Sequence, residues 1–161
     1  LANRVLFRDR VEHAVVRNRR TGDRIAVASG GADGSLAVGS AEGLRWSSLG
    51  PRTIFTDLAW RTTGELVAAG RRIGAGGGGR LWTLPVGDAL GKPSAAARGP
   101  VVEALSPLGS GRLAVAVRTS GGVSVWEIAS PAPGRETELQ PEHVVLRIPA
   151  TGGGVQALAS R

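Results

Sequence analysis

Glycine recurs at short intervals along this chain, and this spacing limits the folds that the chain can adopt. Of the 161 residues 25 are glycine, about twice the usual share. Each glycine inside a helix or strand costs about 0.5–1 kcal/mol relative to alanine, so most of these glycines must occupy turns. The apolar stretches between them span residues 24–29, 35–38, 54–58, 65–69, 101–105, 112–117, 123–128, 144–148 and 155–159. All are too short for a typical helix and several alternate polar with apolar residues, which predicts an all-β fold.

Aligning these sequence stretches with one another reveals a repeat. Each unit reads as a strand, a glycine turn, a second strand, another glycine turn and a third strand that ends in tryptophan. The three tryptophans, Trp46, Trp82 and Trp126, lie 36 and 44 residues apart. A four-stranded propeller blade occupies about 40–45 residues, so the spacing favours blades. With only two phenylalanines in the chain, these tryptophans are the main large side chains available to pack between sheets.

Two segments resemble the WD-repeat family. Residues 111–128 are similar to the second and third strands of a WD repeat, with Ser106-Pro107 in place of the preceding turn and Trp126-Glu127 in place of the Trp-Asp pair. Residues 36–46 are similar to the same segment, with Glu42-Gly43 where the family usually has Asp-Gly. The Gly-His pair and the tight-turn aspartate of the family are missing, so the family's Asp-His-Ser/Thr-Trp network cannot be assembled here.

The resemblance implies an incomplete β-propeller of about three to four four-stranded antiparallel blades. Residues 1–20 would hold the outer strand of a preceding blade, within 4–7 or 14–17, and a loop. Blades one, two and three would occupy 21–52, 53–99 and 100–150, and 151–161 would start a further blade. Three blades and a part do not close a ring. We therefore expect a piece of a longer bacterial protein whose open terminal sheets make it oligomerise or aggregate in isolation.

Residues that carry chemistry are scarce in this sequence. The chain has no cysteine, which excludes disulfides and cysteine metal sites, and His13 and His143 are each isolated. Residues 74–79 match GxGxxG, but a strand and not a helix follows. No Gly-x-Ser-x-Gly motif occurs, and Glu136 and Glu138 lie in a proline-rich connection. We expect no catalytic residue, no metal and no cofactor.

The charge is strongly positive, at +7. Nineteen of the 20 basic residues are arginine, which is typical of a G+C-rich genome, so codon bias explains much of the excess. Residues 1–24 hold seven arginines and three acids and leave open a basic arm that binds nucleic acid. No apolar run is long enough to cross a membrane, and residues 1–10 are too charged for a signal peptide. We expect a cytoplasmic protein.

Blade geometry would bring one set of arginines to a single face. The loops into each first strand and those between second and third strands share a face, with Glu42 as its one clear acid. The predicted partner-binding residues on this face are Arg17, Arg19, Arg20, Arg71, Arg72, Arg98 and Arg118. The turns on the opposite face are mixed, with Asp33 and Glu65 beside Arg61 and Arg112. Codon bias would scatter arginine over both faces, so a one-sided cluster favours an acidic partner.

The sequence thus favours a non-catalytic platform for protein interaction or sensing within a larger signalling or regulatory protein, as the WD resemblance implies. A protein partner is expected, and a membrane or a small-molecule substrate is not. Two alternatives stay open: an enzymatic propeller of the lactonase or hydrolase type whose active-site residues lie in missing blades, and a basic nucleic-acid-binding module.

Overall fold

The computed structural model describes residues 17–21, 24–28, 34–40, 43–50, 52–62, 64–74, 78–86 and 91–149. All the regular structure in these ranges is β-strand, so the predicted all-β class is confirmed. The strands form three sheets whose neighbouring strands are antiparallel except at one short parallel pair. None of the described segments is a helix that could cross a membrane. The predicted outer strand within 4–7, all but the last residue of its alternative at 14–17, and the further blade at 151–161 lie outside the described residues.

The first sheet is a simple up-and-down meander. Its strands are β1 (Arg17–Thr21), β2 (Arg24–Ala28), β3 (Ser35–Ser40) and β4 (Gly43–Ser48), and they pair in chain order. β1 pairs with β2 along its whole length, from Arg17 opposite Ala28 to Thr21 opposite Arg24. The first sheet therefore begins at Arg17, four residues before the boundary expected from the sequence.

The second and third sheets repeat this four-stranded arrangement, and the second adds a fifth strand that covers its outer edge. The second holds β5 (Thr53–Thr62), β6 (Glu65–Arg72), β7 (Gly79–Pro85) and β8 (Ser94–Gly99), in that order. The third holds β9 (Val102–Leu108), β10 (Arg112–Thr119), β11 (Gly122–Ala129) and β13 (His143–Pro149). Between β11 and β13 the chain returns to the second sheet, where β12 (Thr137–Glu138) pairs in parallel with β8.

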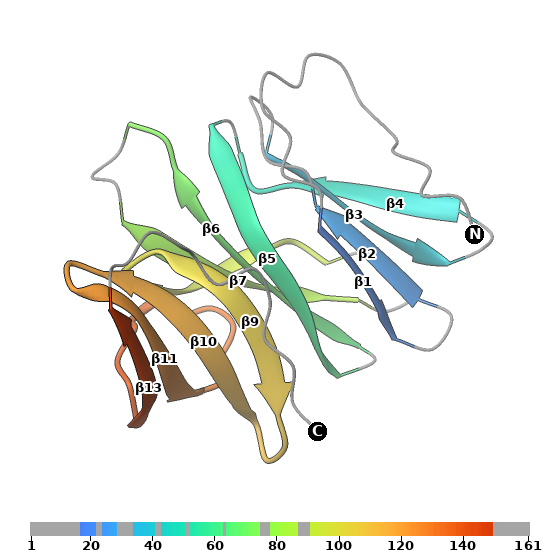
Figure 1. The fold of residues 1–161 in the computed structure, drawn as a ribbon. Helices are drawn as coiled ribbons and strands as arrows, with labels where there is room; N and C mark the ends of the chain where they lie inside the picture. Colours follow the sequence, from blue (N-terminus) through green and yellow to red (C-terminus); the bar gives the residue numbers. More distant parts are fainter. Residues whose placement is uncertain are drawn as a thin grey trace.

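The three sheets lie side by side, with their first strands nearest one another (Figure 1). β5 contacts both β1 and β9. The chain passes from one sheet to the next through residues 49–52 and 100–101, and we call the end of the sheets that holds these two connections the linker end. β5 and β9 both start there, so the turns β5–β6 and β9–β10 lie at the opposite end.

Apolar side chains fill the spaces between the sheets. Between the first and second sheets, Leu36 and Val38 of β3 pack with Phe55, Leu58 and Trp82. Between the second and third, Val67 and Leu81 pack with Leu105, Leu113 and Val115. Alternating residues of the middle sheet thus point into two different cores, which is the pattern of a sheet covered on both faces. A smaller cluster of Ala104, Ala116, Val123 and Val125 lies on the other face of the third sheet.

The three repeated tryptophans do not occupy one equivalent position. Trp82 and Trp126 lie on β7 and β11, the third strands of the second and third sheets, as expected. Trp46 lies on β4, the fourth strand of the first sheet, because β1 adds a strand ahead of the unit that the sequence indicated. Trp82 is 4% exposed, whereas Trp46 and Trp126 are half-buried. The described sheets do not form a closed ring.

Candidate functional site

The one fully buried acid of the described residues serves the fold. Asp57 on β5 is 1% exposed. Its Oδ1 accepts the Leu58 backbone N–H at 2.9 Å, and its Oδ2 accepts the Leu105 backbone N–H of β9, also at 2.9 Å. The neighbouring Thr56 lies at a register shift of β5, and its hydroxyl donates to the Val102 carbonyl. These bonds join the first strands of the second and third sheets, so the carboxylate is engaged by backbone donors.

No metal centre is built by the part of the chain that the structure describes, where His, Asp and Glu side chains never gather in threes. Glu136 and Glu138 are both exposed, as the proline-rich sequence around them indicates. Among the described residues, then, the side chains left to consider for binding are the charged groups on the surface.

Four glutamates each neutralise one arginine. The pairs are Arg61–Glu65, Arg80–Glu136, Arg112–Glu127 and Arg118–Glu103. In the Arg80–Glu136 pair Nε and Oε1 are 3.1 Å apart. Arg118 was predicted to bind a partner, but its guanidinium is occupied by Glu103. These four guanidinium groups are therefore already engaged within the chain, although such exposed pairs add little stability.

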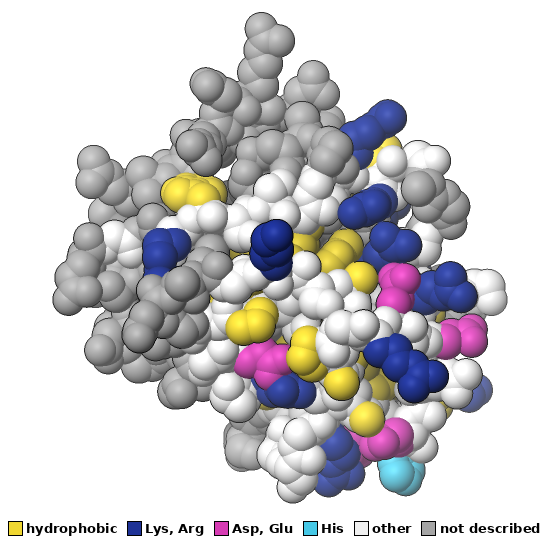
Figure 2. Space-filling view, turned by 180° about the vertical axis from the view of Figure 1, so that it is seen from behind, with side chains coloured by type: hydrophobic (Ala, Val, Ile, Leu, Met, Phe, Trp, Pro, Cys, Tyr) yellow, Lys and Arg dark blue, Asp and Glu magenta, His cyan; other side chains and the backbone are white. Residues whose placement is uncertain are grey.

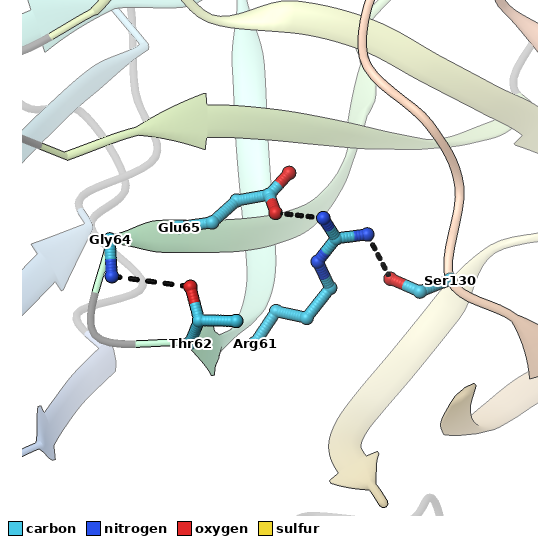
Figure 3. A network of polar contacts seen from close by, with 5 residues as sticks. All are labelled: Arg61, Thr62, Gly64, Glu65 and Ser130. Carbon is cyan, nitrogen blue, oxygen red and sulfur yellow. Dashed lines mark hydrogen bonds and ion pairs between the residues drawn. The ribbon is translucent and has the colours of Figure 1, made fainter. Parts of the chain in front are cut away.

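Arg61 shows how such a pair also connects two sheets (Figure 3). Its guanidinium contacts Glu65 across the β5–β6 turn, and its Nη1 donates to the Ser130 hydroxyl at 3.2 Å. Ser130 directly follows β11 of the third sheet, and its own backbone N–H donates to the Gly111 carbonyl at 2.8 Å. The turn itself is held by Thr62, whose hydroxyl accepts the Gly64 N–H at 3.2 Å.

A different set of arginines lies at the linker end of the second sheet, where no described carboxylate pairs with them. Arg71 and Arg72 end β6 opposite Ile54 and Thr53, and Arg52 directly precedes Thr53. The Ile73 backbone N–H donates to the Arg52 carbonyl at 2.8 Å, which ties the two segments together. All three arginines are exposed. We call Arg52, Arg71 and Arg72 the arginine patch.

Glycine backbone lies beneath two of the three guanidinium groups. A methyl group added at Gly50 would lie 3.7 Å from Arg72 Nη2, and one added at Gly74 would lie 4.0 Å from Arg52 Nη1. Arg72 Nη2 donates to the Leu49 carbonyl at 3.3 Å. The linker is held in turn by Thr53, whose hydroxyl donates to the Gly50 carbonyl at 3.0 Å. Two of the three guanidinium groups thus lie over glycine backbone, and all three side chains are exposed.

The structure brings together some of the predicted partner-binding residues and separates others. Arg71, Arg72, Arg98 and Arg118 all lie toward the linker end, as expected. Arg98 is directly opposite Glu138 in the β8–β12 pair. In the first sheet Arg17 starts β1 at the linker end, whereas Arg19 and Arg20 lie progressively further along the strand. Asp33 and Glu42 lie outside the described residues.

Sequence reasoning missed Arg52. Its backbone has a φ of 60°, a conformation that is uncommon for a residue with a side chain. The only sequence signal was its position in the loop that enters a first strand, beside Pro51. Its proximity to Arg71 and Arg72 follows from the β5–β6 register, which the sequence does not specify.

The rear face of the molecule shows basic side chains that are paired with acidic ones and basic side chains that are not. Figure 2 shows some basic side chains lying directly against acidic ones and others that touch no acidic side chain among the coloured residues. No family model, curated protein or solved structure matches this sequence. The surface chemistry and the sheet arrangement are therefore the observations from which a function can be argued.

Proposed function

We propose that this chain is a segment of a WD-like β-propeller that acts as a platform for a protein partner bearing an acidic segment. Support for blade geometry comes from the three four-strand meanders, whose first strands are adjacent and whose facing surfaces are apolar. The platform would belong to a larger cytoplasmic regulatory protein of a bacterium. No acid–base or metal constellation among the described residues favours an enzymatic propeller.

The observation that carries the proposal is the contrast between two groups of arginines. Arg61, Arg80, Arg112 and Arg118 are each paired with a glutamate. The three members of the arginine patch are exposed and form no ion pair with any described residue, and their backbone positions neighbour one another at one end of one sheet. The fold gains one hydrogen bond from them, from Arg72 to the Leu49 carbonyl, while three like charges on neighbouring backbone positions repel one another. A partner carboxylate would relieve the repulsion.

Guanidinium groups suit such a partner well. Each presents several N–H donors in a fixed plane and binds carboxylates through two parallel hydrogen bonds. Exposed charges of this kind raise the association rate and select the partner more than they add affinity. The linker end is thus expected to bind an acidic peptide with a strong dependence on salt.

The test uses a fluorescently labelled octaglutamate peptide and measures its anisotropy over a salt series. The double variant Arg71→Glu/Arg72→Glu is expected to bind about tenfold more weakly than the original chain and with less dependence on salt. The matched control is Lys92→Glu/Arg135→Glu. It makes the same change in net charge at two exposed residues near the opposite end, where Gly134 contacts Ser94 of β8.

Equal weakening by both double variants would mean that net charge alone attracts the peptide, and the proposal would be rejected. Tighter binding of a single-stranded oligonucleotide of equal charge would favour the nucleic-acid alternative instead. The reversal removes one part-buried hydrogen bond, from Arg72 to the Leu49 carbonyl, worth about 1 kcal/mol. The thermal unfolding temperature should therefore fall by about 2–4 °C, and a larger fall would indicate a folding defect and not a binding defect.

A further inference from the structure

The outer edge of the third sheet differs from that of the second. On the second sheet β12 covers the outer strand β8, and Leu139, which follows β12, is 7% exposed against Gly99. On the third sheet β13 is the outer strand, and it pairs only with β11 within the described residues. One side of β13 thus presents backbone N–H and C=O groups that no described strand uses.

The side chains of β13 are unusually apolar for an open edge. Val144, Val145 and Leu146 are 42%, 64% and 53% exposed, and only one other large apolar side chain, Ile73, is as exposed in the described ranges. The β11–β13 register shifts here and leaves Val145 without a partner on β11. Open edges are normally protected by central charges, and this one has three consecutive apolar residues instead.

Charges stand on either side of this apolar centre. Glu142 precedes β13 and Arg147 lies near its end; both are exposed and neither forms an ion pair in the part of the chain described. In an antiparallel pair of two such strands, Val144 of each copy can face Val145 of the other. The same register places Glu142 of each copy opposite Arg147 of the other, so the segment is complementary to itself in both apolarity and charge.

We propose that two copies of this chain pair through β13, edge to edge and antiparallel, with Val144 opposite Val145 and Glu142 opposite Arg147. The pairing joins two third sheets into one continuous sheet across a two-fold axis. Backbone hydrogen bonds give the affinity, and the apolar centre with its two flanking ion pairs sets the register. This dimer does not involve the arginine patch and does not depend on its function.

Sedimentation velocity of the full 161-residue chain, from low micromolar to submillimolar concentration, tests the pairing. A reversible monomer–dimer equilibrium is expected. Val145→Lys places a charge in the apolar centre and should abolish the dimer. Glu142→Arg or Arg147→Glu alone puts like charges opposite each other twice and should weaken dimerisation about tenfold. The double variant Glu142→Arg/Arg147→Glu should restore it.

The charge variants keep the test decisive if Val145→Lys fails to fold, since both altered residues are exposed. Arg135→Glu, at an exposed position away from β13, is the matched control and should dimerise like the original chain. A chain that is monomeric at every concentration, or a dimer that no β13 variant weakens, overturns the proposal. A double variant as weak as the single ones rejects the register and with it this pairing.

Discussion

The Asp57 carboxylate on β5 accepts the backbone N–H of Leu105 on β9, 48 residues further along the chain. The same carboxylate accepts the N–H of Leu58, so one buried side chain satisfies donors in two sheets. Backbone donors buried without an acceptor cost about 1–3 kcal/mol each. Asp57 therefore fixes how the second sheet lies against the third. Apolar contacts alone define such an arrangement less precisely, because they have no preferred direction.

We expect Asp57→Ala to lower the free energy of unfolding by about 3 kcal/mol, because it removes the charged acceptor of two backbone N–H groups at a buried site. Asp57→Asn keeps one acceptor oxygen and should cost about half as much. Urea unfolding followed by tryptophan fluorescence measures both values. A loss below about 0.5 kcal/mol for the alanine variant would show that water reaches these N–H groups and that the carboxylate is dispensable.

Trp82 is the tryptophan on which the core depends most. Its ring meets Phe55 edge to face, with centroids 6.4 Å apart and the planes inclined by 62°. We expect Trp82→Ala to cost about 3–5 kcal/mol in unfolding free energy. Trp126 is half-buried, so Trp126→Ala should cost roughly half of that, less than its place in the repeat alone indicates. Equal losses in denaturant unfolding would contradict this ranking.

The sequence predicted the strands in which apolar and polar residues alternate between glycine turns. It did not predict strands whose own residues carry no such pattern and which form only because they pair with a neighbouring strand. The stretches 65–69, 112–117 and 123–128 fall within β6, β10 and β11. β8 was missed because its centre is three alanines, which give no β signal; β7 recruits it by pairing. The β1 segment is rich in arginine, so no apolar pattern marked it as the start of the first sheet.

Site prediction was limited in the same way. Arginine is frequent throughout this chain, so its frequency in a segment could not show which guanidinium groups pair with a glutamate of the same chain and which can bind a partner. Which glutamate reaches which arginine depends on register and on long returns of the chain, as when Glu136 comes back to Arg80 on β7. The grouping of Arg71 and Arg72 was accessible because they are adjacent, whereas the addition of Arg52 required the fold.

Gly79 permits a close approach of two backbone segments. A Cβ at this position would lie 2.7 Å from the Val101 Cα and against the Pro100 carbonyl oxygen, both in the connection between the second and third sheets. We expect Gly79→Ala to cost about 3 kcal/mol, because backbone atoms cannot yield as a flexible side chain can. Gly121→Ala is the matched control, since nothing lies within 4 Å of its added methyl group. Thermal unfolding should separate the two variants clearly; equal unfolding temperatures would contradict the close contact.

Thr83 on β7 carries the one buried side-chain oxygen of the described residues that has no hydrogen-bond partner. The residue is 0% exposed, so its hydroxyl has lost its hydrogen bonds to water without forming one to the protein. Thr83→Val replaces that hydroxyl with a methyl group of similar size and should raise the free energy of unfolding by about 1 kcal/mol.

Thr53→Val makes the same change at an equally buried threonine whose hydroxyl donates to the Gly50 carbonyl at 3.0 Å. There the substitution removes a hydrogen bond and should lower the free energy by about 1 kcal/mol. Opposite signs in paired urea titrations are the expected result, and a loss of stability in both variants would mean that the Thr83 hydroxyl has a partner after all.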